Sequence, residues 1–76
     1  MRVLINSRIY SMTRKQLTGV LNIAKKQIPF GIYAVEKDGV CELRKDVFGS
    51  KEELDREVAG YEAEGFRVYK NEHGQK

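Results

Sequence analysis

The sequence is poor in the residues on which catalytic and metal-binding chemistry most often depends. It contains one histidine, His73, one cysteine, Cys41, and no tryptophan. A general base must be held within hydrogen-bond reach of its proton, and His73 lies in a polar C-terminal segment. One histidine and one cysteine supply too few ligands for a transition-metal site within one chain. The sequence therefore predicts a protein that is not an enzyme and has no metal or other cofactor.

The single cysteine also excludes an intramolecular disulfide, and with it the stapled scaffolds of small secreted proteins. No hydrophobic run approaches transmembrane length, and too few apolar residues follow Arg2 for the core of a signal peptide. We therefore expect a cytoplasmic protein with no membrane partner. Cys41 falls on the predicted inward face of a strand, where a cysteine behaves as a small, unreactive hydrophobic residue.

Acidic residues are absent from the first part of the chain. Residues 1–35 contain six Lys or Arg and no Asp or Glu, whereas residues 36–76 contain eight Lys or Arg and eleven Asp or Glu. The two parts carry +6 and −3, which sum to the net charge of +3. This asymmetry favours an anionic partner. Alternatively, the two parts fold against each other and their charges partly compensate.

The composition that remains is typical of one small globular domain. The chain has 76 residues, of which 41% are hydrophobic and 33% are charged, and these values are those of a folded soluble domain. We predict a single compact domain over residues 1–70 and a polar, flexible tail over residues 71–76. A domain of this size needs its apolar side chains for the core, so we expect no deep pocket and no small-molecule substrate.

Two amphipathic helices are predicted from their capping signals. Thr13 and Gln16 have the spacing of a capping box, and Ser50 and Glu53 repeat that spacing later in the chain. Pro29 should end the first helix, because the residue before a proline is disfavoured in the helical conformation. The second helix should end at Gly65, which can adopt the left-handed conformation. Strands are predicted over residues 2–12 and 66–70, outside the two helices.

Between the helices, residues 32–48 predict a β-hairpin closed by Asp38-Gly39. A type I′ turn needs positive φ at both central residues, which Asp tolerates and Gly prefers. The turn sets a register in which Val35 pairs with Glu42, and Tyr33 with Arg44. One face of the hairpin is then predicted to point inward and consists of Ile32, Ala34, Cys41, Leu43 and Val47.

The resulting order of elements is βαββαβ, which predicts the α+β class. With right-handed crossovers, it most simply forms a ferredoxin-like fold. That fold has a four-stranded antiparallel sheet in the order 4-1-3-2 with two helices on one face. Many unrelated functions share this fold, so the fold alone predicts none of them.

A sheet with both helices on one face leaves its other face open. The predicted register places basic residues and tyrosines on that open face, where phosphates could pair with Arg or Lys and bases could stack on Tyr. We therefore interpret the chain as a non-enzymatic binding module, with single-stranded nucleic acid as the leading partner. The expected binding residues are Arg2, Arg8, Tyr33, Lys37, Arg44, Arg67 and Tyr69.

A protein-interaction module is the alternative. Leu4, Val35 and Val40 would form an apolar strip on the same open face, which a second copy of the chain could cover to form a homodimer. The second helix offers a different surface, because it is rich in carboxylates that could imitate nucleic acid towards a basic groove of a partner protein. A small accessory or inhibitor protein of the kind that phages encode would act in this way, through Glu53, Glu57 and Glu64.

Overall fold

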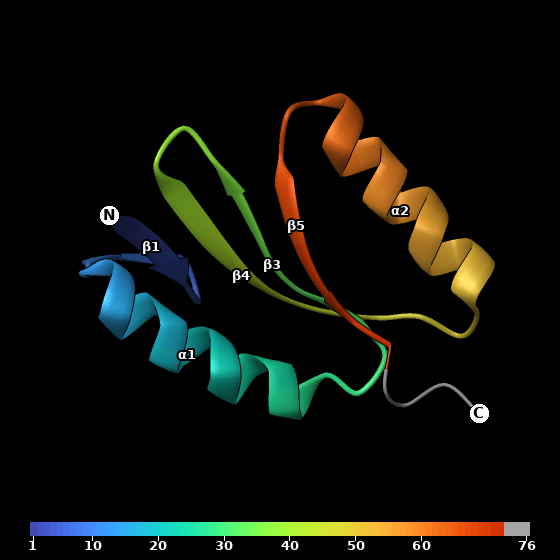
Figure 1. The fold of residues 1–76 in the computed structure, drawn as a ribbon, viewed down its shortest axis with the longest axis horizontal. Coiled ribbons are helices and arrows are strands. Elements are labelled where there is room, and N and C mark those ends of the chain that lie inside the picture. Colours follow the sequence, from blue (N-terminus) through green and yellow to red (C-terminus); the bar gives the residue numbers. More distant parts are fainter. Residues whose placement is uncertain (73–76) are drawn as a thin grey trace.

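The computed structural model describes residues 1–72 and confirms the α+β class, with two helices and a five-stranded mixed sheet (Figure 1). In chain order the elements are β1 (Arg2–Ile5), β2 (Arg8–Ser11), α1 (Arg14–Gln27), β3 (Gly31–Lys37), β4 (Val40–Val47), α2 (Lys51–Ala63) and β5 (Arg67–Asn71).

The topology differs from the predicted four-stranded antiparallel sheet. The strand order is β2-β1-β4-β3-β5. The β1 and β4 strands pair in parallel, and the other three neighbouring pairs are antiparallel. The prediction of a ferredoxin-like order 4-1-3-2 is therefore wrong. Only the neighbouring pairs β1–β4 and β4–β3 were placed correctly.

The difference begins at a turn that the sequence interpretation missed. Asn6 and Ser7 have φ values of 50° and 67°, and Ile5 pairs with Arg8 on either side of them. Two central residues with positive φ are the requirement of a type I′ hairpin turn. The segment predicted as one strand is therefore a hairpin. Its second strand, β2, occupies the edge of β1 that the last strand of the predicted fold would have used.

The added hairpin also places the helices on opposite sides of the sheet. The crossovers β2–α1–β3 and β4–α2–β5 both run towards the β5 edge, but β2 and β4 run in opposite directions. Two right-handed crossovers with these directions must lie on opposite faces. The prediction that both helices share one face is consequently wrong, and the sheet has an α1 side and an α2 side (Figure 1).

Each side of the sheet has its own hydrophobic core. Leu17 of α1 packs with a cluster on the α1 side, and Leu54 of α2 packs with a cluster on the α2 side; both side chains are fully buried. The central strand β3 contributes to both cores. Its residues Gly31–Val35 are all buried, which is the pattern of a strand covered on both faces.

The β3–β4 hairpin follows the predicted register near its turn and departs from it further away. Asp38 and Gly39 have positive φ, and Val35 pairs with Glu42 as predicted. The predicted Tyr33–Arg44 pair is wrong, because the register shifts between Ile32 and Ala34. The same irregularity affects the pairing with β5, where Ile32 pairs with Lys70 and Ala34 with Tyr69, so that Tyr33 is an extra residue in β3.

This irregularity changes which side chains face which helix. Tyr33 and Ala34 both pack in the core on the α1 side, whereas Ile32 packs on the α2 side with Val35. The predictions that Tyr33 faces away from the helices and that Ile32 shares a face with Ala34 are therefore wrong. Val47, predicted to point inward, is 64% exposed.

The ends of the helices agree with their sequence signals. Thr13 and Gln16 form the predicted capping box at α1, and the Ser50 hydroxyl accepts a hydrogen bond from the Glu53 N–H at α2. After α2, Gly65 has a φ of 88°. The Phe66 N–H donates to the Tyr61 carbonyl, and their rings meet edge to face. These contacts form a Schellman motif with its hydrophobic contact.

The last strand extends one residue beyond the predicted end of the domain. Asn71 belongs to β5 and is buried, and its side-chain amide donates to the carbonyls of Lys25 and Ile28 at 3.0 Å each. Residue 71, predicted as the first residue of the polar tail, is therefore part of the sheet. The description ends at Glu72, so the rest of the predicted tail, including His73, lies outside the described residues.

Candidate binding groove beside helix α1

A groove of about 510 Å³ lies on the α1 side of the sheet, between α1 and the edge strand β5. We call it the α1–β5 groove. One wall is formed by α1, and the tyrosines of β3 and β5 lie beside it. The residues that line it are Arg14, Thr18, Leu21, Asn22, Tyr33, Arg67 and Tyr69.

A carboxylate next to the groove is held by residues that line it. The Arg14 guanidinium donates to both oxygens of Glu36, with N–O distances of 3.3 and 3.4 Å. The Tyr69 hydroxyl donates to Glu36 Oε1 at 2.8 Å. The Glu36 side chain is only 15% exposed, whereas that of Arg14 is 61% exposed. Arg14 therefore keeps donors available to solvent while its position is fixed by Glu36.

The surroundings of Glu36 determine its ionisation. Burial raises the pKa of the carboxyl, but hydrogen bonds from Arg14 and Tyr69 and the charges of Arg14 and Arg67 together lower the pKa below its ordinary value. Burial and the bond to Glu36 raise the pKa of Tyr69, so its hydroxyl stays protonated and continues to donate. At neutral pH the negative charge of Glu36 is thus already compensated within the chain.

Two tyrosines and an arginine form an aromatic corner of the groove. The rings of Tyr33 and Tyr69 lie 6.1 Å apart and are inclined at 47°, and the Arg67 guanidinium lies 5.2 Å from the centre of the Tyr69 ring. Tyr33 is 9% exposed, so it mainly supports the corner. Arg67 is exposed and presents a planar cation stacked on an aromatic ring.

A second hollow of about 520 Å³ adjoins the groove along α1, since Asn22 lines both hollows. Lys25 and Lys26 lie in the last turn of α1 and line this second hollow with Pro29 and Asn71. Since α1 contains no acidic residue, the wall of the groove carries positive charge at both ends of the helix.

The structure brings together three of the residues predicted to bind and separates the other four. Tyr33, Arg67 and Tyr69 meet in the α1–β5 groove. Arg2 and Arg8 lie in the β1–β2 hairpin, at the other edge of the sheet. Lys37 and Arg44 each lie close to an aromatic ring on the α2 side of the molecule: the Lys37 ammonium is 5.2 Å from the Phe66 ring, and the Arg44 guanidinium is 6.0 Å from the Tyr61 ring.

Arg44 is also held by two carboxylates of its own strand. It donates to Asp46 at 3.0 Å and to Glu42 at 3.3 Å, and its side chain is 34% exposed. The bond to Asp46 is the largest cause of a raised pKa for the guanidinium. The prediction that Tyr33 and Arg44 are neighbours on one open face is therefore wrong, because they lie on opposite sides of the sheet.

The sequence interpretation did not select three residues of α1 that line the groove. Arg14, Thr18 and Asn22 recur at every fourth position, which places them along one face of a helix. That face lies beside the hydrophobic stripe, and the sequence shows it as a polar row in a helix without acidic residues. The row itself can be detected in the sequence. Its position beside β5 cannot, because the predicted fold places the last strand at the other edge of the sheet.

The acidic residues predicted as an alternative site are exposed on α2. Glu57 and Glu64 line a shallow hollow of about 200 Å³ together with Gly60 and Tyr61, and Glu53 is exposed at the start of the helix. Cys41 is fully buried, as predicted. Burial raises the pKa of its thiol to about 11, so the thiolate is not populated at neutral pH.

Comparison of the chain with protein-family models, with curated proteins and with solved structures gave no significant match. Within residues 1–72, neither helix has the length and apolar character that crossing a membrane requires.

Proposed function

We propose that the chain is a non-enzymatic binding module that holds single-stranded nucleic acid in the α1–β5 groove. The observation that carries this proposal is the approach of Arg14 from α1 and Arg67 from β5 to one open groove that also contains tyrosines. Cationic groups that track a phosphate backbone, combined with planar groups that stack on bases, are the two features shared by single-strand binding surfaces.

The charge of the groove supports an anionic ligand. Four positive charges line the two adjoining hollows, contributed by Arg14, Arg67, Lys25 and Lys26. Glu36 is the carboxylate bonded to the groove residues, and Arg14 and Tyr69 already satisfy it. A phosphate would therefore meet a surface whose net charge is positive, without having to approach an unpaired carboxylate.

The aromatic corner supports an unpaired base rather than an anion alone. The Arg67 guanidinium covers the Tyr69 ring, and bases stack on both arginine planes and tyrosine rings in RNA-binding proteins. A base inserted at this corner would extend that stack. A duplex keeps its bases stacked inside the helix, so a corner of this kind favours a single strand.

Fluorescence anisotropy with labelled oligouridine and oligodeoxythymidine, measured across a salt series, tests the proposal. Four phosphate contacts would give a slope of about −3 in log K against log salt concentration. Replacing Arg14 or Arg67 by Ala should reduce the magnitude of the slope by about 0.7 each. Tyr69→Ala should weaken binding by about 1–3 kcal/mol, the value of one stacked base.

Arg56→Ala is the matched control, because Arg56 is an exposed arginine on α2, away from the groove. It should leave affinity and salt slope almost unchanged. The proposal is contradicted by the absence of binding at low salt, or by an equal loss of affinity in the Arg56 and Arg67 variants.

A further inference from the structure

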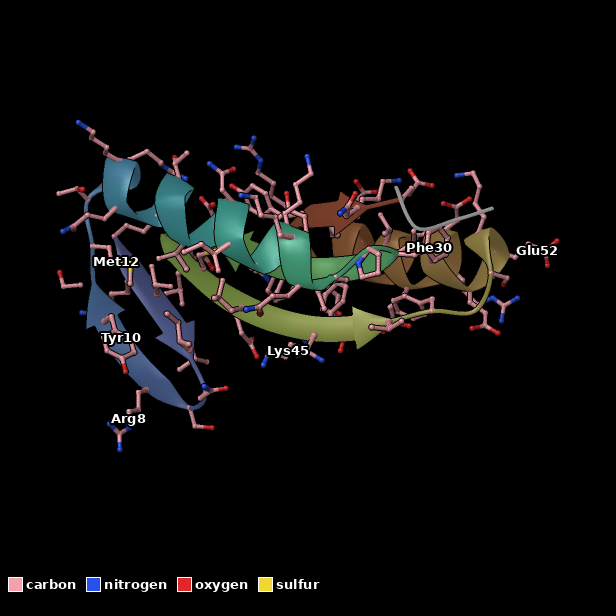
Figure 2. All side chains as sticks on the ribbon, turned by 90° about the horizontal axis from the view of Figure 1, so that it is seen from below. Arg8, Tyr10, Met12, Phe30, Lys45 and Glu52 are labelled. Carbon is pink, nitrogen blue, oxygen red and sulfur yellow. The ribbon has the colours of Figure 1, made fainter. Side chains whose placement is uncertain are left out.

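The β1–β2 hairpin projects from the body of the protein (Figure 2) and carries an uncovered apolar strip. Ile9 is 67% exposed and Val40 is 37% exposed. Leu4 pairs with Ile9 and lies on the opposite face from Val3, which is fully buried on the α1 side. Leu4, Ile9 and Val40 therefore share the α2 side of the sheet, where α2 covers β3 and β5 but not the hairpin. We call these three residues the outer strip.

Three charged residues border the outer strip. Arg2 and Lys37 both pair with Val40, so their side chains belong to the same side as the strip. Glu42 pairs with Leu4 on that side, and its carboxylate forms an ion pair within its own strand. Arg2 is exposed and forms no ion pair with another residue in the range 1–72. The uncovered surface thus combines apolar groups with an unpaired positive charge.

The hollow on α2 has the complementary character. It is lined by Glu57, Gly60, Tyr61 and Glu64, and neither carboxylate forms an ion pair within the described chain. Among the described residues, a Cβ on Gly60 would meet no atom within 4 Å outside the backbone of its own helix, although glycine inside a helix costs about 1 kcal/mol relative to alanine. The glycine leaves the helix surface flat between the two carboxylates.

We propose that two copies of the chain form a reciprocal dimer in which the outer strip of each copy packs on the α2 hollow of the other. The strip and the hollow lie on the same side of the sheet but towards opposite edges. A two-fold axis that runs parallel to the strands and brings the α2 sides of two copies face to face places each strip opposite α2 of the other copy. An axis across the strands would instead place strip on strip. Arg2 of each copy then meets Glu57 and Glu64 of the other copy, so this contact occurs twice in a closed, isologous interface.

Sedimentation velocity over a range of protein concentrations at low and high salt tests the dimer. The wild-type chain should form a dimer that weakens as salt is raised. Arg2→Glu and Glu57→Arg should each raise the dissociation constant about tenfold or more, since each places like charges opposite one another. The double variant with both changes should regain much of the lost affinity, because positions 2 and 57 again carry opposite charges. The recovery should be incomplete, because Glu64 then faces a like charge.

Lys15→Glu is the control, since Lys15 is exposed on α1 and has the same change of charge as the Arg2 variant. It should leave the dimer intact, and circular dichroism should show that every variant keeps its helices. A monomeric wild-type chain would overturn the proposal, as would a double variant as monomeric as the single ones. The α1–β5 groove lies on the other side of the sheet, so nucleic-acid binding and dimerisation can fail independently.

Discussion

The two sides of the sheet carry helices of similar length, 14 residues in α1 and 13 in α2, but they use their charged residues differently. On the α1 side, Arg14, Glu36 and Tyr69 are bonded to one another across three elements. On the α2 side, the carboxylates of the helix are exposed to solvent, and the helix buries Leu54 and Val58 against an apolar layer.

This difference is the reason for which the proposed binding site is placed on the α1 side. Polar groups that join a helix to two strands have fixed positions, and fixed positions are what recognition of a charged ligand requires. Exposed carboxylates on one helix contribute solubility and long-range charge. The asymmetry of the sequence, basic first and acidic later, thus becomes an asymmetry between the two helix layers.

The largest expected effects on the free energy of unfolding come from truncating a large buried side chain in each of the two cores. Leu17→Ala on the α1 side and Leu54→Ala on the α2 side should each lower the free energy of unfolding by about 2–5 kcal/mol. The two clusters are separated by the sheet, so the double variant should lose the sum to within about 0.5 kcal/mol. Urea unfolding measures all three variants. A deviation from additivity well above about 0.5 kcal/mol would mean that the two clusters form one core.

The next largest effect concerns the strand shared by both cores. Gly31→Ala should lower the free energy of unfolding by about 1–3 kcal/mol or more, because its Cβ would overlap the Asp46 carbonyl oxygen of β4. Gly19→Ala is the matched control: a Cβ there meets nothing, and alanine should stabilise α1 by up to about 1 kcal/mol. Equal effects in urea unfolding would show that β3 and β4 are not as close as described.

A smaller effect, which depends on pH, concerns the carboxylate that Arg14 and Tyr69 hold on the α1 side. Glu36→Gln should cost about 1 kcal/mol at neutral pH. The folded-state pKa of Glu36 lies below its ordinary value of 4.5, so its stabilisation is present above pH 4.5 and is lost as pH falls through the folded-state pKa. The free energies of unfolding of the wild type and the variant, measured as a function of pH, should therefore converge in acid. Curves that stay separated by the same amount in acid would contradict this role of Glu36.

The smallest effect concerns the turn that sends the helices to opposite sides. Ser7→Gly should raise the free energy of unfolding by about 0.5–1 kcal/mol, because Ser7 has a φ of 67° and glycine adopts positive φ without steric cost. Thermal unfolding would detect the increase. A loss of stability would indicate that the Ser7 side chain makes a contact that outweighs its backbone strain.

The local structure was largely predictable from the sequence because its signals are local. Thr13, Pro29, Asp38-Gly39 and Gly65 each determine a helix end or a turn through the conformation of a few residues. The topology was not predictable in this way, because Asn6-Ser7 is a weaker turn signal than Asn-Gly and the alternation over residues 2–12 also fits one strand. Without this turn, the predicted fold has β5 at the wrong edge of the sheet and α2 on the wrong side.

The candidate groove could be predicted only in part for the same reason. Arg67 and Tyr69 are adjacent outward positions of one strand, and the sequence alone shows this. Their meeting with Arg14 depends on the strand order, and the orientation of Tyr33 depends on the irregularity between Ile32 and Ala34. Both are tertiary properties that a period-two pattern does not encode.

The most direct test of the central claim is an NMR titration of the labelled chain with oligouridine, in which backbone amide shifts are followed residue by residue. Binding in the groove should give the largest shifts at Arg14, Thr18, Asn22 and at residues 67–69, with small shifts on α2. Shifts concentrated on α2 or on the β1–β2 hairpin, or no shifts at low salt, would contradict the assignment of binding to the α1–β5 groove.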